Sequence, residues 1–220
     1  MVTFDQQAQF AVQRAAMVQV QLKDRGITDA RVLAVMGELP REAFVSPAYW
    51  AEAYADRPLP IGMGQTISQP YIVARMTEAL DIEPENEVLE LGTGCGYQTA
   101  ILARLARRVF TIDRVGQLTE GAQAVLGRLG IENVEYFVGD GSKGWPGGRR
   151  FDRIIVTAAV PQVPQPLLDQ MGDDAVLVAP VGSEFSQDLI VHEKSGDEHR
   201  TRILCGCRFV KLVGKHGFAE

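Results

Sequence analysis

The pattern of apolar and polar positions divides the chain near residue 85. Before that point, apolar residues recur every three or four positions, as the residues on one face of a helix do. The clearest stripe lies in the segment YIVARMTEAL and consists of Ile72, Val73, Met76 and Leu80. Pro70 is well placed in the first turn of the helix that this stripe predicts.

Start and stop signals mark other helices in the N-terminal part. Thr3 and Gln6 have the spacing of a capping box, and the helix that they open should end at Gly26, because glycine readily adopts the conformation of a helix C-terminus. Thr28 is placed to cap the apolar segment that follows it. The prolines of DRPLPIG remove backbone donors and should hold that segment extended, outside regular structure.

After residue 85, short apolar runs alternate with helical patterns. The runs that predict strands are EVLELG, RVFTID, VEYFVG, DRIIVTA, AVLVAPV, DLIVHE and ILCGCRFV. The helical patterns between them are YQTAILARLA, VGQLTEGAQAVLGRLG and PQPLLDQM. Strands joined by such crossovers run parallel, with helices on both faces of the sheet. The last two runs are separated only by KSGDEHRT, which predicts a hairpin and an antiparallel strand.

The whole pattern predicts an α/β fold. We expect a Rossmann-like, doubly wound sheet of seven mostly parallel strands with an N-terminal helical extension. Residues 1–84 should form the helical segment and a loop that packs on a core of residues 85–220, so that the two parts make one compact domain.

The composition is that of an ordinary soluble globular protein. Among 220 residues, 46% are apolar and 23% are charged, and no run of 18 apolar residues could form a membrane span. The N-terminus lacks the regions of a secretion signal, and three scattered cysteines are too few for a disulfide framework, so we expect a cytoplasmic protein. The net charge of −6 disfavours nucleic acid as a partner.

A glycine-rich turn follows the first of the seven predicted strands, in the segment VLELGTGCGYQTA. The strand should deliver Gly92, Gly94 and Gly96 to a tight turn before a helix begins near Tyr97. Without Cβ atoms at the glycines, a ligand can lie against the backbone. The dinucleotide-binding fingerprint requires a glycine where this chain has Tyr97, so a dinucleotide-dependent dehydrogenase is disfavoured.

Acidic residues end the first three predicted strands, at the sheet edge where ligands bind in folds of this kind. Glu90 precedes the glycines; it would repel a pyrophosphate but could pair with the ammonium group of an amino-acid-like cofactor. Asp113 is placed to accept hydrogen bonds from ribose hydroxyls, and Asp140 is placed where an adenine amine could be bound. The three acids and the glycines therefore predict one cofactor site.

The segment GQTISQP is uncharged and leads into the helix predicted from Pro70. Its hydroxyl residues, Thr66 and Ser68, lie near a helix N-terminus, where unpaired N–H groups and a partial positive charge favour an anion. The alternative is that Ser68 or Gln69 only caps the helix. The local pattern leaves both interpretations open.

Together these segments resemble one family, the protein-L-isoaspartate O-methyltransferases, over nearly the full length of the chain. The similarity is carried by LPREAFV, AYADRPLPIGMGQTISQPYIVARM, VLELGTGCGYQTAILA, FDRIIVTAA, LVAPVG and RFVKLV. The glycine loop is shared by many S-adenosylmethionine methyltransferases, so the segment that contains GQTISQP is the specific part of the resemblance.

The resemblance implies roles for individual residues. Ser68, the serine of the TIS triplet, falls on the family's active-site position, and Thr66 and Ile67 beside it would contact the substrate. The cofactor contacts that the resemblance implies are Gly92, Gly94, Asp113, Asp140 and Gly141. The pattern of the glycine turn adds Glu90 and Gly96 to this set. Two positions depart from the family: Asp113 replaces a glutamate and reaches less far, and Lys211 replaces a proline at the substrate rim.

The implied function is methyl transfer from S-adenosylmethionine, without a metal and with S-adenosylhomocysteine as product. The acceptor would be the free α-carboxylate of L-isoaspartyl residues in damaged proteins and peptides, whose methylation initiates repair through a succinimide. That carboxylate is ionised near neutral pH and needs no general base, so neutral donors such as Thr66 and Ser68 would suit it better than an arginine clamp. We expect a monomer with no membrane partner.

Two other functions remain open at this point. A methyltransferase for a different carboxylate, such as an aspartate in a modified peptide, would use the same machinery with a different rim. A non-enzymatic cofactor-binding module would be expected to lose Ser68 or the glycines, and both are present. The dispersed histidines fit no catalytic triad, and Cys205 and Cys207 are interpreted as core residues rather than metal ligands.

Overall fold

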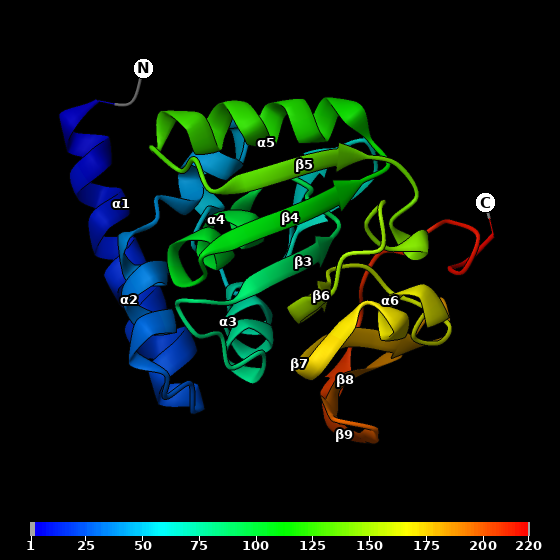
Figure 1. Cartoon of the computed structure of the whole chain (residues 1–220). Coiled ribbons are helices and arrows are strands. Elements are labelled where there is room, and N and C mark those ends of the chain that lie inside the picture. Colours follow the sequence, from blue (N-terminus) through cyan, green and yellow to red (C-terminus); the bar gives the residue numbers. More distant parts are fainter. Residues whose placement is uncertain (1–2, 220) are drawn as a thin grey trace.

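The computed structural model of the chain describes residues 3–219, which form a seven-stranded sheet covered by helices (Figure 1). Across the sheet, the strands follow the order β5-β4-β3-β6-β7-β8-β9. These strands are β3 (Glu87–Leu91), β4 (Arg108–Asp113), β5 (Val134–Val138), β6 (Phe151–Val156), β7 (Met171–Gly182), β8 (Gln187–Ser195) and β9 (Glu198–Cys207). The α/β class, the strand number and the N-terminal helical extension are confirmed.

The strands from β3 to β7 are parallel, and β3 is the middle strand of these five. It pairs on one side with β4 and on the other with β6. After β3 the chain forms β4 and β5 on one side, and it then crosses to form β6 and β7 on the other side. The carboxyl end of β3 is therefore the point at which the strand order reverses. In open α/β sheets, ligands bind at such a point.

Helices and strands bury two apolar clusters, one on each face of the sheet. Alternate strand residues point to opposite faces, so Val88 lies in the first cluster and Leu89 in the second. The first cluster contains residues of α1 to α5, and the second contains Leu167 of α6. The helices are α1 (Phe4–Ala16), α2 (Ala30–Glu38), α3 (Pro70–Ala79), α4 (Tyr97–Leu105), α5 (Gly116–Arg128) and α6 (Gln165–Asp169).

The N-terminal helices begin and end largely where the sequence predicts. Thr3 and Gln6 form the capping box of α1, and the helical path continues through a π-helical and a 3-10 segment to Gly26, whose φ is 91°. The predicted cap of α2 is wrong. Asp29 accepts the N–H groups at the start of that helix, while the N–H and hydroxyl of Thr28 donate to Glu78.

An additional hairpin precedes α3. Strands β1 (Leu59–Gly62) and β2 (Gln65–Ile67) pair antiparallel, and their turn contains Met63 and Gly64, both with positive φ. The expectation that DRPLPIG lies outside regular structure is therefore wrong, because β1 is an edge strand, where proline is tolerated. Before the hairpin, the chain forms the 3-10 helices Arg41–Phe44 and Pro47–Glu52.

The C-terminal part adds two antiparallel strands and then returns to the sheet centre. β8 pairs with β7 and β9 pairs with β8, and these strands extend into most of the predicted KSGDEHRT loop. After β9, the N–H of Ala159 donates to Val210 and the N–H of Leu212 donates back to Ala159, at 2.7 Å and 2.8 Å. These bonds place residues 208–213 beside the carboxyl end of β6.

Candidate active site

The glycine turn at the end of β3 requires its glycines for conformation and for space. Gly92, Gly94 and Gly96 have φ of 100°, 54° and 88°, in the left-handed region that other residues avoid. A Cβ on Gly92 would lie 2.3 Å from the hydroxyl oxygen of Thr157. That hydroxyl donates to the carbonyls of Leu91 and Gly92 at 2.9 Å and 2.7 Å, so Thr157 fastens the turn to the end of β6.

Asp113 ends β4 and faces the same turn. Its Oδ2 accepts the N–H of Gly94 at 2.8 Å, and its Oδ1 accepts the N–H of Val115 at 2.9 Å. A carboxylate has about four acceptor positions, so each oxygen can accept one further hydrogen bond. Asp113 can therefore bind a pair of ligand hydroxyls while it holds the turn.

A cleft of about 70 Å³ lies along the ends of the central strands, and we call it the strand-end cleft. Gly92, Asp113 and Gly141 line it together, and Leu212 and Val213 of the returning C-terminal segment line it as well. Gly141 offers no Cβ to the cleft. The cleft thus joins three of the predicted cofactor residues at the point where the strand order reverses.

Asp140 lies next to this cleft and is already bonded to the protein. Its Oδ1 accepts the N–H and hydroxyl of Ser142, and its Oδ2 accepts the N–H of Lys215 at 2.9 Å. Partial burial raises the pKa of Asp140, but these hydrogen bonds outweigh burial and hold the pKa below its usual value. Asp140 lines an adjoining cavity of about 430 Å³ and fixes the C-terminal segment beside it.

Glu90 and Gly96 lie behind the turn. Glu90 is fully buried, and its Oε2 accepts the hydroxyls of Thr99 and Thr111 at 2.5 Å and 2.6 Å, while its Oε1 has no partner among the described residues. Burial raises the pKa of Glu90 to about 8. A Cβ on Gly96 would lie 2.9 Å from the Cβ of Ala122 in α5. Both residues thus support the turn through the protein interior.

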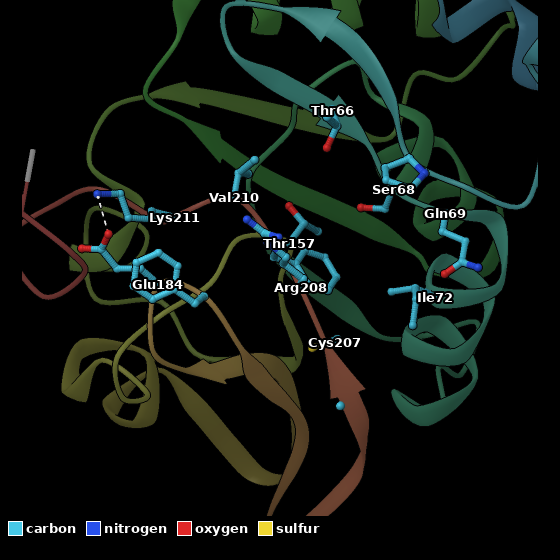
Figure 2. A pocket seen from close by; sticks show the side chains of 14 residues that line it. Thr66, Ser68, Gln69, Ile72, Thr157, Glu184, Cys207, Arg208, Val210 and Lys211 are labelled. Carbon is cyan, nitrogen blue, oxygen red and sulfur yellow. Dashed lines mark ion pairs between the residues drawn. The ribbon is translucent and has the colours of Figure 1, made fainter.

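Ser68 lies where the cofactor side and the outer surface meet. A small cavity of about 50 Å³, which we call the junction pocket, is lined by Ile67, Ser68, Gly92 and Gly94, among others. Ser68 also lines an outer cavity of about 620 Å³, and Thr66 and Thr157 belong to both linings. Figure 2 shows this outer cavity, with the hydroxyls of Thr66 and Ser68 directed into it from the β2 side and Thr157 opposite them.

Of the two residues in the capping interpretation, Gln69 occupies the N-cap position of α3 without a side-chain hydrogen bond, and Ser68 does not cap the helix. Among the described residues, none makes a hydrogen bond with the hydroxyl of Ser68. The backbone carbonyl of Ser68 accepts a hydrogen bond from Arg41. The hydroxyl is therefore available to a ligand in either cavity.

Arg41 fixes the backbone of Ser68 from the protein interior. Its side chain is fully buried, and Nη2 donates to the Ser68 carbonyl at 2.7 Å while Nε donates to the Ala53 carbonyl at 2.8 Å. The guanidinium lies over the ring of Tyr97, 4.8 Å from its centre, at the start of α4. Burial lowers the pKa of Arg41. Arg41 thus connects the Ser68 loop to the helix that follows the glycine turn.

Three residues of this region were not predicted from the sequence. Thr157 follows the fourth strand of the sheet, so the rule that ligands bind at strand ends could have identified it. Arg208 lines the outer cavity and follows β9. For Arg41, the only signal is a charged pair, Arg41 and Glu42, inside the otherwise apolar segment LPREAFV, and the partners of Arg41 are 12 and 27 positions away.

Within residues 3–219, no group of three or more His, Cys, Asp or Glu side chains could hold a metal ion. In the same part of the chain, no helix is long and apolar enough to cross a membrane. His192 and His199 contact each other on the β8–β9 hairpin.

A family model and the sequences of known proteins identify the same family for this chain. The family model described as protein-L-isoaspartate(D-aspartate) O-methyltransferase matches residues 12–217. A protein-L-isoaspartate O-methyltransferase of Methanoregula boonei is 53% identical over 206 residues, 94% of this chain and 95% of the relative. Another from Desulfosudis oleivorans is 49% identical over the full length of both chains.

Solved structures give the same result for the fold. A protein-L-isoaspartate O-methyltransferase structure superposes with a TM-score of 0.84 at 28% identity, covering 93% of this chain and 67% of that one. A putative enzyme of this kind from Plasmodium falciparum, in complex with S-adenosyl-L-homocysteine, has a TM-score of 0.76 at 23% identity, covering 91% and 98%. At that identity the second likeness shows the fold alone.

Proposed function

Because the chain belongs to the protein-L-isoaspartate(D-aspartate) O-methyltransferase family, we propose that the hydroxyl of Ser68 holds the acceptor carboxylate in its active site. The chain is a methyltransferase that uses S-adenosylmethionine and methylates the free α-carboxylate of L-isoaspartyl residues in damaged proteins and peptides. Methylation activates that carboxyl group, which starts repair through a succinimide.

The residues at the sheet edge fit S-adenosylmethionine. The two free acceptor positions of Asp113 suit the ribose hydroxyls, and Gly92 and Gly141 leave room for the ligand in the strand-end cleft. Gly94 and Asp140 line cavities that share residues with the cleft and would complete the contacts. Glu90 and Gly96 would act on the cofactor through the turn that they support, since one is buried and the other packs against α5.

Methyl transfer to a carboxylate requires alignment more than acid–base chemistry. When bound, S-adenosylmethionine supplies a methyl group on a sulfonium; a carboxylate oxygen forms the new bond, the carbon–sulfur bond breaks, and its electron pair stays on sulfur. An α-carboxyl group has a pKa of about 3.3–3.7, so no base is needed at neutral pH. The chain must hold the carboxylate in line, which can lower the barrier by up to about 7–11 kcal/mol.

One observation carries the proposal: the hydroxyl of Ser68, which has no hydrogen-bond partner among residues 3–219, lies between the junction pocket and the outer cavity. The side chains of Thr66 and Ile67 line the same pocket, and Arg41 fixes the Ser68 backbone. A hydroxyl at this point can donate to a carboxylate that enters from the outer cavity. The methyl group then passes directly to the substrate, and Ser68 is not a nucleophile.

A pair of peptides tests the substrate assignment. We expect an isoaspartyl peptide to be methylated by labelled S-adenosylmethionine at least about 100-fold faster than its aspartyl twin. The reason is that the two carboxylates differ by one methylene in position and a misplacement of about 1 Å can cost that factor. Comparable rates on the two peptides would contradict the isoaspartyl assignment and favour a methyltransferase for another carboxylate.

Ser68→Ala tests the role of the hydroxyl. We expect an unchanged melting temperature and cofactor affinity, because Ser68 caps no helix, and a single-turnover rate that falls about 100-fold. Ser46→Ala is the matched control, since Ser46 also precedes a proline-started helix and makes no side-chain cap bond. A wild-type rate in Ser68→Ala would contradict the proposal, and a methyl-labelled serine trapped on the enzyme would contradict direct transfer.

The same proposal includes the state in which the enzyme acts. We propose a monomer in the cytoplasm, with isoaspartyl proteins and peptides as partners and no nucleic acid. The net charge of −6 supports the last point, since it repels phosphate backbones. Residues 1–84 and 85–220 are proposed to act as one domain, and an apolar cluster that contains both Phe10 and Val88 supports this.

A further inference from the structure

Within the described part of the chain, one cation of the outer cavity has no hydrogen-bond or ion-pair partner. Its charged lining residues are Glu184, Arg208 and Lys211. Lys211 forms an ion pair with Glu184 at 3.4 Å. No hydrogen bond or ion pair connects the Arg208 side chain to any residue between 3 and 219. The lining therefore carries one uncompensated positive charge in a chain whose net charge is −6.

The backbone around Arg208 is held firmly in place. The N–H of Phe209 donates to the side chain of Gln187 at 2.8 Å, and the carbonyl of Val210 accepts the N–H of Ala159 at 2.7 Å. The guanidinium thus extends from a fixed point beside the end of β6. Figure 2 shows Arg208 among the residues that line the outer cavity, on the other side of the cavity from Ser68.

We propose that Arg208 binds the α-carboxylate of the isoaspartyl residue before methyl transfer and so determines the affinity for the charged substrate. This inference rests on the proposed function, because it assumes that the isoaspartyl α-carboxylate is the acceptor and that it binds in the outer cavity. A guanidinium is always charged and presents a planar set of N–H donors that matches a carboxylate. The donors of Arg208 remain unused by the described residues, while Lys211 is already paired.

An arginine at the acceptor carboxylate departs from the sequence-based expectation that neutral donors suit this group better, and the outer cavity contains both kinds of donor. The ion pair with Arg208 has opposite effects on substrate binding and on methyl transfer. An ion pair stabilises the fully charged carboxylate more than a transition state in which that charge is being neutralised, so it lowers KM without raising kcat. The methyl ester that forms carries no charge, and no proton moves in the step. Arg208 therefore loses its partner when the product is made, which favours product release.

Arg208→Gln gives the main test. We expect the KM for an isoaspartyl peptide to rise about 10- to 100-fold, as loss of a charged hydrogen-bond partner does, with kcat unchanged or higher and cofactor affinity unchanged. Arg208→Lys should recover part of the affinity because it keeps the charge. Arg202→Gln is the control, since Arg202 lies on β9, pairs with Glu193 and does not line the outer cavity, and it should leave KM unchanged.

A binding measurement separates this role from a structural one. The isoaspartyl peptide and its analogue with an α-amide are compared as ligands of the wild type and of Arg208→Gln. We expect the wild type to prefer the carboxylate about 10- to 100-fold, and the variant to lose that preference. An equal preference in both proteins, or a fall in kcat with unchanged KM, would overturn the role of Arg208. If wild-type enzyme does not methylate the isoaspartyl peptide, the proposed function fails instead.

Discussion

Removal of the guanidinium of Arg41 should disturb both stability and catalysis. In Arg41→Met, a side chain of similar length and lower polarity fills the same buried site, and the carbonyls of Ala53 and Ser68 lose their donors. The Ser68 backbone is then held by β2 and α3 alone. The variant therefore changes the position of the proposed active-site hydroxyl without touching either cavity lining directly.

The contacts of Arg41 set the expected magnitude. Two hydrogen bonds to a charged donor contribute about 1.5–3 kcal/mol each, and removal of the buried charge offsets part of this because its desolvation cost disappears. We expect the free energy of unfolding to fall by about 2–4 kcal/mol. For a chain of this size, that lowers the melting temperature by about 5–15 °C. A shift of Ser68 by about 1 Å would slow methyl transfer up to about 100-fold.

Arg153→Met is the matched control for this variant. Arg153 is also nearly buried, and it donates to the carbonyls of Asp81, Asp152 and Asp174 at the opposite end of β6. Thermal unfolding and the single-turnover rate are measured for both variants at a temperature well below both transitions. We expect similar losses of stability but a slower rate only in Arg41→Met. Equal rates in the two variants would refute the coupling of Arg41 to Ser68.

Two further predictions concern the acids of the turn. Asp113→Ala should weaken cofactor binding by about 1–3 kcal/mol in calorimetry, because the ribose acceptor is lost. Asp152→Ala is the control, because it removes a carboxylate that is bonded to the N–H of Glu87, and it should leave cofactor binding unchanged. Unchanged affinity in Asp113→Ala would mean that this acid is misassigned. Burial raises the pKa of Glu90 to about 8. Between about pH 5 and pH 8 the folded chain therefore keeps a proton that the unfolded chain has lost, and this group makes stability fall as pH rises, by about 1.4 kcal/mol per unit at most. Glu90→Gln should remove that slope when melting temperatures at pH 5.5 and pH 8 are compared, and an equal slope in both proteins would contradict the raised pKa.

Local signals in the sequence were sufficient for the fold and for one side of the site. Five apolar runs joined by crossovers predict a parallel sheet, because such strands are buried on both faces. The capping box at Thr3 and Gln6 and the start of α3 at Pro70 involve residues within one helical turn, and the structure confirms both. Asp113 and the glycines come together because parallel strands end at the same edge.

Tertiary packing decided what local signals left open. Thr28 and Asp29 are both good helix caps. Asp29 is the cap of α2 because the N–H and hydroxyl of Thr28 donate to Glu78, which lies 50 positions away in the sequence. The edge strand β1 exists only because β2 pairs with it. Glu90 ends a strand as predicted, but the packing of α4 and β4 around it directs its carboxylate to two threonines.

The cations of the site were also decided in three dimensions. Arg41 and Arg208 each stand beside apolar residues in the sequence, and nothing within a few positions shows which will be buried and bonded and which will be left without a partner. Arg41 is bonded because the chain returns to it at Ser68, 27 positions later. Arg208 lies in the outer cavity because the segment after β9 folds back onto Ala159. Partners at such separations are fixed by packing of the whole fold, because a side chain reaches only the atoms that distant elements bring to it.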